Sequence, residues 1–324
     1  MGMKAVIQHE FGDINVLTYT DAIVPEIGEN EVLIKVAYTS VNYADIKKRK
    51  GNKEKGNLPS ILGLDAAGTI EVASPESNFK KGERVIAFPK YGSYAEYAVA
   101  NEKLVFKIPE NLSFELAASM PTVSILAYML LHEIGQVKKT DTIVIHSAAG
   151  GVGSMLVQLA KLVGVHKIIG TVGNLNKGDY IKGLGAHVVC TYDSFEKEVF
   201  KETSNHGANI IFDSVAGEIT SKSLECLALY GTLVQFGNSS GKAGHFKTSD
   251  VHSSCRNIKG FSLGTTRKHD PERLAPVAKK VLNLFAAEKI TLPVARVFNL
   301  SDVGLAHKLV ESRNYKGKVL MKVY

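Results

Sequence analysis

The sequence predicts an α/β protein in which a doubly wound parallel-sheet nucleotide domain is inserted into a mainly antiparallel, partly barrel-like β substrate domain. Three observations predict it. Residues 1 to about 110 consist of short strand-like segments separated by turn residues, a pattern typical of antiparallel sheets. From Asp141, apolar strand segments alternate with helical stretches, as in parallel sheets with crossover helices. Beyond Arg267 the alternation is lost, so we expect the chain to return to the first domain.

The length and composition are those of a two-domain globular protein. The 324 residues are about twice a typical domain, and 45% are hydrophobic and 22% charged. We expect residues 1–124 and 267–324 to form the substrate domain and residues 125–266 the dinucleotide-binding domain. No apolar run reaches the ~18 residues needed to cross a bilayer, and the N-terminus resembles a strand rather than an export signal. We therefore expect a soluble, cytoplasmic protein without a membrane partner.

The first domain begins with seven strand candidates, which are KAVIQHE, NVLTYT, EVLIKVAYTSVN, AAGTIEVA, RVIAF, YAEYAVA and LVFKIP. After these strand candidates, the spacing of the apolar residues changes from that of strands to that of helices. From Phe114 to Gly135 the chain is apolar enough for buried helices. Pro121 interrupts this run and is expected to start the second helix, because proline is tolerated in the first helical turn.

The stretch Ile143–Gly153, IVIHSAAGGVG, is the centre of the second domain. A β-branched apolar run breaks into small residues and then into a helix-like stretch. In the spacing Ala148-x-Gly150-x-x-Gly153, Gly150 lets a pyrophosphate approach the backbone, and Gly153 lets the helix pack against the strand. The alternative is a tight strand-to-helix turn without a ligand. The context of the glycine turn favours a dinucleotide site, because the turn follows the first of the six strand candidates of this domain.

The six strand candidates of this domain are TIVIHSA, HKIIGTV, HVVCTY, NIIFDSV, GTLVQFG and IKGFSLG. A long amphipathic helix is expected beyond Arg267, with Asp270 as N-cap and Pro271 at the first position. Pro276 falls inside that span, so the helix either kinks there or starts later. VARVF, VGLAHKLVESR and KVLMKVY then predict a strand, a helix and a terminal strand.

The net charge is +7 and the pI is near 9.0. Such a surplus suits polyanions, either a phosphorylated cofactor or nucleic acid. The densest basic cluster, Lys47–Lys55, is interpreted as a solvated surface. The three cysteines lie far apart, which argues against a disulfide framework.

Several motifs in this order resemble the medium-chain dehydrogenase/reductase superfamily, and more closely its zinc-independent quinone oxidoreductases that use NADPH. The motifs are HSAAGGVG at 146–153, DSV at 213–215, FGNSSG at 236–241 and ESRNYKGK at 311–318. The resemblance covers nearly the whole chain. It implies an enzyme that transfers hydride from NADPH to a quinone.

Zinc-dependent relatives carry an early Cys, then Gly-His-Glu, then a four-Cys lobe. The corresponding stretches here are Asn42-Tyr43-Ala44-Asp45 and Gly63-Leu64-Asp65, and the first cysteine of the chain is Cys190. Leu64 cannot bind a metal, and Asn42 replaces the thiolate. The sequence therefore predicts no metal site, with a site scattered among the ten histidines as the remaining alternative.

The preference for NAD or NADP depends on the residues about 20 positions beyond the glycine turn, where NAD-specific sites place an acidic residue. GTVGNLNK at 170–177 has none. The 2′-phosphate of NADPH is instead expected to contact the stretch that contains Gly173, Asn174 and Lys177, with Tyr192 covering it. In the family the matching Lys and Tyr play that part. The alternative is that Lys177 is only a solvated residue at a helix start.

The resemblance implies further cofactor contacts. Gly151 and Val152 would lie against the pyrophosphate, Ser214 near the adenosine, and Leu263 near the nicotinamide. The strand-end crevice would be lined by Phe236, Gly237 and Asn238. Arg313 would reach across the domain cleft toward the cofactor. An equally weighted alternative is that Arg313 only forms a salt bridge on the last helix.

The catalytic candidates also come from the resemblance. Asn42 would offer its side-chain amide and Asp45 would orient a ribose or nicotinamide group, with an Asx turn as the alternative role of the pair. Tyr43 and Tyr128 would line the pocket or donate a proton, unless they serve only in packing. Lys47 and Leu126 depart from the family pattern, which leaves the substrate open.

Three functions follow from these readings. The first is NADPH-dependent reduction of a quinone, and the second is reduction of an activated C=C bond in an enone, alkenal or enoyl thioester. The third, of another class, is an NADPH-linked RNA-binding protein, although no aromatic residues are interleaved with the basic cluster. Relatives form dimers by joining nucleotide domains, so we also expect a homodimer, with GTLVQFG or IKGFSLG supplying the edge.

Overall fold

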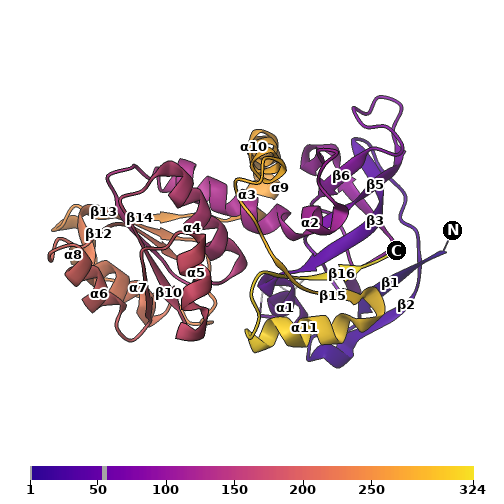
Figure 1. Cartoon of the computed structure of the whole chain (residues 1–324). Helices are drawn as coiled ribbons and strands as arrows, with labels where there is room; N and C mark the ends of the chain where they lie inside the picture. The colour runs from indigo at the N-terminus through magenta and orange to yellow at the C-terminus, as the bar shows by residue number, and fades with distance from the viewer. Residues whose placement is uncertain (1, 53–56) are drawn as a thin grey trace. The chain divides into compact units, whose positions relative to one another are not determined.

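The computed structural model describes residues 2–52 and 57–324, so residues 53–55 of the basic cluster lie outside the described residues. The chain divides into two compact units, coloured along the sequence in Figure 1. The first unit contains residues 1–125 and 267–324, and the second contains residues 126–266. Within the described residues no helix is long and apolar enough to span a bilayer.

The first unit is built on two sheets. Its strands are β1 (Gly2–Gln8), β2 (Leu17–Ile23), β3 (Glu31–Val41), β4 (Ser60–Ile61), β5 (Ala66–Ala73), β6 (Arg84–Ala87), β7 (Tyr97–Asn101), β8 (Val105–Lys107), β15 (Val294–Asn299) and β16 (Lys318–Lys322). The larger sheet has the order β15-β16-β3-β5-β6-β8, with β7 also paired to β3, and the smaller has the order β2-β1-β4. Most of these pairs are antiparallel, as the sequence predicts; β15 and β16 are parallel.

Strand β3 is the centre of the larger sheet. It pairs with β5 along most of its length, with β7 at its start and with β16 at its end. The register places Val319 of β16 opposite Val41, the last residue of β3. The C-terminal segment therefore completes the sheet begun by the N-terminal one, and it brings residue 318 next to residue 42.

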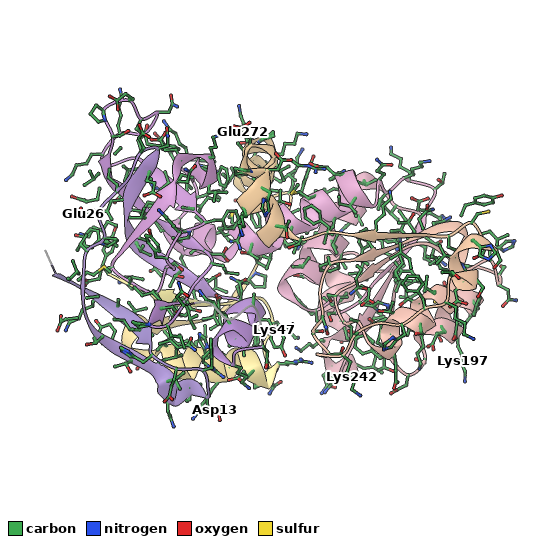
Figure 2. All side chains as sticks on the ribbon, turned by 180° about the vertical axis from the view of Figure 1, so that it is seen from behind. Asp13, Glu26, Lys47, Lys197, Lys242 and Glu272 are labelled. Atoms are coloured by element: carbon green, nitrogen blue, oxygen red, sulfur yellow. The ribbon has the colours of Figure 1, made fainter. Side chains whose placement is uncertain are left out.

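The helices of the first unit are α1 (Tyr43–Arg49), α2 (Phe114–Ser119), α10 (Leu274–Ala286) and α11 (Val303–Ser312), with α3 (Pro121–Met129) and α9 (Leu263–His269) crossing the boundary. The expectation that Pro121 starts a second helix is confirmed. Glu272, labelled at the surface in Figure 2, forms an ion pair with Lys103 at 2.6 Å. This pair joins the returning segment to the N-terminal part of the unit.

The second unit holds one six-stranded parallel sheet with the order β11-β10-β9-β12-β13-β14. Its strands are β9 (Thr142–Ile145), β10 (Lys167–Val172), β11 (Val188–Thr191), β12 (Ala208–Asp213), β13 (Leu227–Gln235) and β14 (Asn257–Gly260). Its helices are α4 (Gly151–Val163), α5 (Gly178–Leu184), α6 (Phe195–Glu202), α7 (Glu218–Glu225) and α8 (Ser249–His252). Helix α4 contacts α5, and α6 contacts α7 (Figure 1). The doubly wound sheet is confirmed.

One predicted boundary around Arg267 is wrong, and for the long helix the alternative of a later start is confirmed. The strand expected over IKGFSLG ends at Gly260, and Leu263 begins helix α9 because Ser262 Oγ accepts the backbone N–H of Thr265 at 3.2 Å. The long helix does not start at Pro271, which begins a short 3-10 turn. Helix α10 starts at Leu274, so Pro276 falls in its first turn, where its missing N–H costs no helical hydrogen bond.

Two further expectations need correction. GTLVQFG lies in β13, which is paired with β12 and β14, so it is not an edge; β14 is the strand at the end of the sheet order. The basic cluster is not wholly a solvated surface, because the Arg49 side chain is fully buried. Its burial depends on partners from distant segments, described below.

The close packing of α4 on β9 predicts a large effect of one methyl group. A Cβ added to Gly153 would lie 2.3 Å from the Ser147 carbonyl oxygen, which is backbone and cannot move aside. We expect Gly153→Ala to lower the free energy of unfolding by about 1–3 kcal/mol. The control is Gly183→Ala in helix α5, where an added Cβ meets nothing within 4 Å, so we expect a gain of up to about 1 kcal/mol. Denaturant melts of both variants test this, and equal stabilities would contradict it.

Candidate functional site

The turn between β9 and α4 presents a helix N-terminus at the carboxyl end of a strand. Gly150 is the N-cap of α4, in extended conformation. The Cβ of Ala148, which stands in the first glycine position, lies 2.9 Å from where Gly170 would carry a Cβ, so β10 leaves room for that alanine. The first N–H groups of a helix have no acceptor within it. They and the positive helix end form a site suited to an anion such as a pyrophosphate.

Two side chains hold this turn in place. His146 is fully buried, with Nδ1 2.9 Å from Thr171 Oγ1 and Nε2 2.8 Å from Ser223 Oγ. Burial lowers the pKa of His146 to about 4, so the ring is neutral at pH 7. Ser147 donates its N–H to the Tyr192 hydroxyl at 2.9 Å, and the two hydroxyls are 3.0 Å apart. Tyr192 therefore lies against the glycine turn, from the end of β11.

The residues proposed to contact a 2′-phosphate follow β10. Asn174 precedes a 3-10 turn, Leu175–Lys177, and its Oδ1 accepts the Asn176 N–H at 2.9 Å. Lys177 ends that turn and precedes α5. A Cβ at Gly173 would meet nothing within 4 Å. The stretch is thus an open loop at the carboxyl end of β10, beside the strand that carries the glycine turn.

The loops after β12 and β13 pack on each other. Asp213 is buried, and its carboxylate accepts the N–H groups of Val215 and Ala216 and the hydroxyl of Thr220. It thereby fixes the loop that carries Ser214. A Cβ at Gly237 would lie 3.0 Å from the Ser214 carbonyl oxygen. The backbone of residues 236–238 therefore comes close to Ser214, at the carboxyl ends of both strands.

Two further predicted residues of this unit, Leu263 and Tyr128, lie on helices and not in the loops at the carboxyl ends of the strands. Leu263 is buried at the start of α9. Tyr128 lies on α3, and its ring centroid is 4.2 Å from that of His132. This packing occupies one face of the Tyr128 ring.

The first unit carries a buried polar cluster at the end of β3. Asn42 follows β3 and caps α1, and its N–H donates to Asp45 Oδ2 at 2.8 Å. Its amide is engaged at both ends: Oδ1 accepts from Lys318 Nζ at 2.6 Å, and Nδ2 donates to Asp65 Oδ2 at 2.7 Å. The other Asp65 oxygen accepts the N–H and the hydroxyl of Thr122. We name Asn42, Asp45, Asp65, Thr122 and Lys318 the β3-end cluster.

Sequence reasoning missed two important members of this cluster. In the sequence, Asp65 only follows Leu64 at the position of a lost metal ligand, and Lys318 is only the last residue of the ESRNYKGK motif. No local pattern marks either residue, because their partners come from β3 and from the opposite end of the chain. The pairing of β16 with β3 is what brings them together.

The charges of the cluster oppose one another. Burial raises the pKa of Asp45 to about 6, while the N–H of Asn42 and the charge of Lys318 act to lower it. Burial lowers the pKa of Lys318, and Asp65 and Asp45 act against that shift. The same two carboxylates act against the lowering of the pKa of Arg267 by burial. Two buried carboxylates thus interact with the buried cation of Lys318 and the partly buried cation of Arg267.

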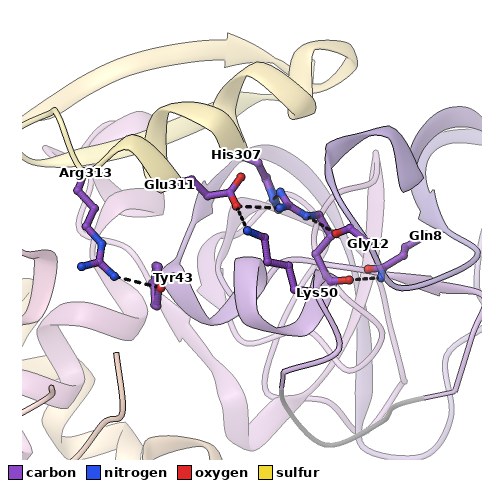
Figure 3. Close-up of polar contacts among 8 residues, drawn as sticks. Gln8, Gly12, Tyr43, Lys50, His307, Glu311 and Arg313 are labelled. Carbon is purple, nitrogen blue, oxygen red and sulfur yellow. Dashed lines mark hydrogen bonds and ion pairs between the residues drawn. The ribbon is translucent and has the colours of Figure 1, made fainter. Parts of the chain in front are cut away.

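Tyr43 and Arg313 lie together at the edge of this unit. Arg313 Nη2 donates to the Tyr43 hydroxyl at 3.1 Å, and its guanidinium lies 5.3 Å from the centre of the Tyr43 ring (Figure 3). Tyr43 is 38% exposed. Arg313 adopts a left-handed conformation at the end of α11, which points this side chain back toward α1.

The residues at the end of β3 bear on the prediction that the chain has no zinc site. In the ranges 2–52 and 57–324, no three or more His, Cys, Asp or Glu side chains are grouped to hold a metal. At the two positions where zinc-dependent relatives carry Cys and His, this chain has Asn42 and Leu64. The Asn42 oxygen is bound by the Lys318 ammonium, so a second cation there would be repelled.

Comparisons with known proteins agree with this architecture. The model of the alcohol dehydrogenase GroES-like domain matches residues 28–110, and the model of the zinc-binding dehydrogenase domain matches residues 151–280. A probable quinone oxidoreductase of Schizosaccharomyces pombe is 32% identical over 96% of this chain and 94% of its own length. A quinone oxidoreductase of Pseudomonas aeruginosa is 31% identical over 96% and 97%.

A solved structure gives the same result. The Escherichia coli quinone oxidoreductase, crystallised in complex with NADPH, has a TM-score of 0.92 and 28% identity, with 99% of this chain and 100% of that chain covered. The similarity therefore extends over both units of the chain.

The buried neutral His146 predicts a pH dependence of stability. Because its pKa is lowered from 6.5 to about 4 in the folded chain, the unfolded chain binds a proton first as the pH falls. Stability is therefore lost progressively from about pH 6.5 down to pH 4, by about 3 kcal/mol from this group.

The measurement compares unfolding free energies of the wild type and His146→Gln between pH 7 and pH 4. We expect a shallower loss in the variant, whose amide can still bond to Ser223. His206→Gln, at an exposed histidine of the same unit, is the control and should keep the wild-type slope. Parallel curves for all three proteins would contradict the prediction.

Proposed function

Because the chain belongs to the quinone oxidoreductase family of the medium-chain dehydrogenases/reductases, we propose that it transfers hydride from NADPH to a quinone without zinc. The observation that carries the proposal is the glycine turn. Gly150 caps α4 at the carboxyl end of β9, and a Cβ at Gly153 would clash with the backbone of Ser147. The residues present thus fit a pyrophosphate, which Gly151 and Val152 would contact through their N–H groups.

NADPH, rather than NADH, is supported by the loop after β10. It carries Asn174 and Lys177 and no carboxylate that would repel a 2′-phosphate. Tyr192 is held nearby through its bonds to Ser147. The E. coli relative and a mycobacterial relative of 30% identity and TM-score 0.91 were both crystallised with NADPH. We propose that Ser214, Phe236, Gly237, Asn238, Leu263 and Arg313 complete the contacts with the nucleotide.

The nucleotide preference is tested at Lys177. We expect the wild type to favour NADPH over NADH by at least about tenfold in kcat/KM, because a lost phosphate contact costs ~1.4 kcal/mol. Lys177→Ala should reduce kcat/KM for NADPH and leave that for NADH nearly unchanged. Lys182→Ala, at an exposed lysine of the following helix, is the control and should keep the preference. Equal use of both nucleotides by the wild type would contradict the proposal.

Bound NADPH supplies the hydride, so the protein's task is to position the reactants and to stabilise developing negative charge on the acceptor. A quinone or an enone is electrophilic enough to accept hydride without a metal. We propose that Asp45 orients a hydroxyl or amide of the nicotinamide half. Asn42 fixes Asp45 through its N–H and bridges Lys318 and Asp65 through its amide. Tyr43 and Tyr128 are proposed to line the acceptor site, where either hydroxyl can donate a proton.

The acceptor class is tested by stopped-flow oxidation of NADPH with a quinone and an enone side by side. The hydride acceptors differ, because a quinone gains hydride and proton at conjugated carbonyls, whereas an enone gains them across the C=C bond. We expect kcat/KM to be higher for the quinone. A higher value for the enone would make the C=C reductase the function, and oxidation with neither would reject both.

We further propose that the chain forms a homodimer through the edge strand β14 and has no nucleic-acid partner. In the described sheet β14 pairs only with β13, which leaves one row of its N–H and C=O groups for a second copy. Sedimentation should give the mass of two chains. Salt-dependent binding of RNA by the protein would instead support the RNA-binding alternative.

A further inference from the structure

The side-chain amide of Asn42 is buried at the end of β3, and both of its donor hydrogens and its oxygen are engaged. Nδ2 donates to Asp65 Oδ2 at 2.7 Å and to Ser40 Oγ at 3.3 Å. Oδ1 accepts from Lys318 Nζ at 2.6 Å. Because a primary amide has only two N–H groups, Asn42 has no side-chain N–H left to donate to the oxygen of a hydride acceptor.

The charged residues on either side decide which way this amide points. Lysine can only donate hydrogen bonds, and a carboxylate can only accept them. The carbonyl oxygen of Asn42 must therefore face Lys318, and its NH₂ group must face Asp65. The reverse orientation would set donor against donor and acceptor against acceptor inside a buried site, where unmade hydrogen bonds are costly.

Asp65 is the anionic end of this arrangement, and it is held by several groups. Besides Asn42, its Oδ2 accepts from Ser40 Oγ at 2.7 Å, and its Oδ1 accepts from the N–H and the hydroxyl of Thr122 at 3.1 Å and 2.5 Å. Its backbone carbonyl accepts from Thr39 Oγ1 at 2.7 Å. These partners come from β3 and from the start of α3, so two elements fix the position of Asp65.

Lys318 is the cationic end, and the backbone at the start of β16 holds it. Its N–H donates to the Pro293 carbonyl at 2.8 Å. Gly317, which precedes it, has a φ of 89°, and an added Cβ there would lie 1.9 Å from the same carbonyl oxygen. Only glycine fits such a position. The chain therefore enters β16 in one conformation, with Lys318 Nζ against Asn42.

Asn42 passes this restraint on to Asp45 through the backbone. The Asn42 N–H donates to Asp45 Oδ2 at 2.8 Å, and the Asp45 N–H donates to the Asn42 carbonyl at 3.0 Å. Both the carboxylate and the main chain of Asp45 thus depend on the position of Asn42. Asp45 is the residue proposed above to orient a hydroxyl or amide of the nicotinamide half.

We propose that Lys318 and Asp65 are positioning residues, which hold the two ends of the Asn42 amide so that Asn42 keeps the Asp45 carboxylate in one orientation. Asn42 acts on Asp45 in this arrangement and not on the hydride acceptor. The inference deepens the proposed function, on which it rests for the role of Asp45 toward the cofactor.

The other end of α1 is anchored independently of this cluster. The Arg49 side chain is fully buried. Its Nε donates to the Gly12 carbonyl at 3.1 Å, Nη1 is 3.1 Å from His307 Nδ1, and Nη2 donates to Glu311 Oε1 at 2.9 Å (Figure 3). Lys50 also pairs with Glu311, at 2.5 Å. We therefore expect α1 to stay in place when Lys318 is changed, so that the change acts on Asn42.

The first test is Lys318→Met, which keeps an unbranched side chain and removes the donor. NMR follows the backbone N–H of Asn42 in protein labelled with ¹⁵N at asparagine, with Asn42→Asp to identify the signal. Burial raises the pKa of Asp45 to about 6, so spectra are recorded at pH 8, where its carboxylate is charged. We expect the signal to move upfield in Lys318→Met, because the bond to Asp45 lengthens. Lys322→Met, at an exposed lysine of the same strand, is the control and should keep the wild-type signal.

The kinetic effect of Lys318→Met should appear in kcat. We expect kcat for NADPH oxidation to fall at least about tenfold, because a small misplacement of an orienting group slows the reaction of the bound nucleotide. KM for NADPH should change little, since most of the proposed nucleotide contacts lie in the second unit. Lys322→Met should keep both constants. A raised KM with a wild-type kcat would contradict the positioning role.

An exchange of charge tests the orientation of the amide, and it decides the proposal even if Lys318→Met does not fold. Asn42→Asp sets two carboxylates against each other, and Asp65→Asn sets two amides against each other, so each should lower the Tm. The double variant Asn42→Asp/Asp65→Asn again pairs one carboxylate with one amide, and its carboxylate faces Lys318. Because the two sites are in direct contact, their effects should not add, and the double variant should recover most of the lost Tm.

Two results would overturn the proposal. One is a wild-type Asn42 signal in Lys318→Met, and the other is a double variant that melts no higher than the less stable single variant. If the wild type oxidises no NADPH, the proposed function fails, while the NMR and melting comparisons still decide whether Lys318 and Asp65 position Asn42.

Discussion

The burial of charge is the constraint on which the first unit depends. Arg49 and Lys318 are buried cations, and Asp45 and Asp65 are buried carboxylates. Each is tolerated because it has at least one hydrogen-bond partner within the unit, since an unpaired buried charge costs several kcal/mol. Those partners come from both ends of the chain: β3 and α1 supply one set, and α11 and β16 the other. The discontinuous unit is therefore a condition for the cluster, because residues 307–318 must return to residues 42–49.

The candidate site of the second unit is built differently from the buried cluster of the first unit. Its candidate site is made of backbone, from the N-terminus of α4 and the loops after β10, β12 and β13. The controlling interaction is the close approach of α4 to Ser147, which only a residue without Cβ allows at position 153. The buried side chains of His146 and Asp213 hold these turns in place. His146 is hydrogen-bonded to Thr171 and Ser223, and Asp213 accepts a hydrogen bond from Thr220. Side chains in this unit therefore hold the backbone of the candidate site in place.

What could be predicted from the sequence follows from this difference. The parallel sheet and the glycine turn are local patterns, so β9 to β14 and the start of α4 were predicted. The predicted end of β14 is wrong, because a single N-terminal cap, Ser262, starts helix α9. The prediction that Arg49 is solvated is wrong, because its partner His307 lies 258 residues away. An i, i+4 pair is visible in a sequence, but which helix faces it is not.

The β3-end cluster also explains why an amide suits position 42. A carboxylate there would add a third buried negative charge, and a thiolate would lack a donor for Asp65. An amide accepts from Lys318 at one end and donates to Asp65 at the other, 2.6 Å and 2.7 Å away. It thus links a buried cation to a buried anion without adding charge. The cation already present is Lys318, held by β16 through its register with β3, so the electrostatics of this position depend on the last strand of the chain.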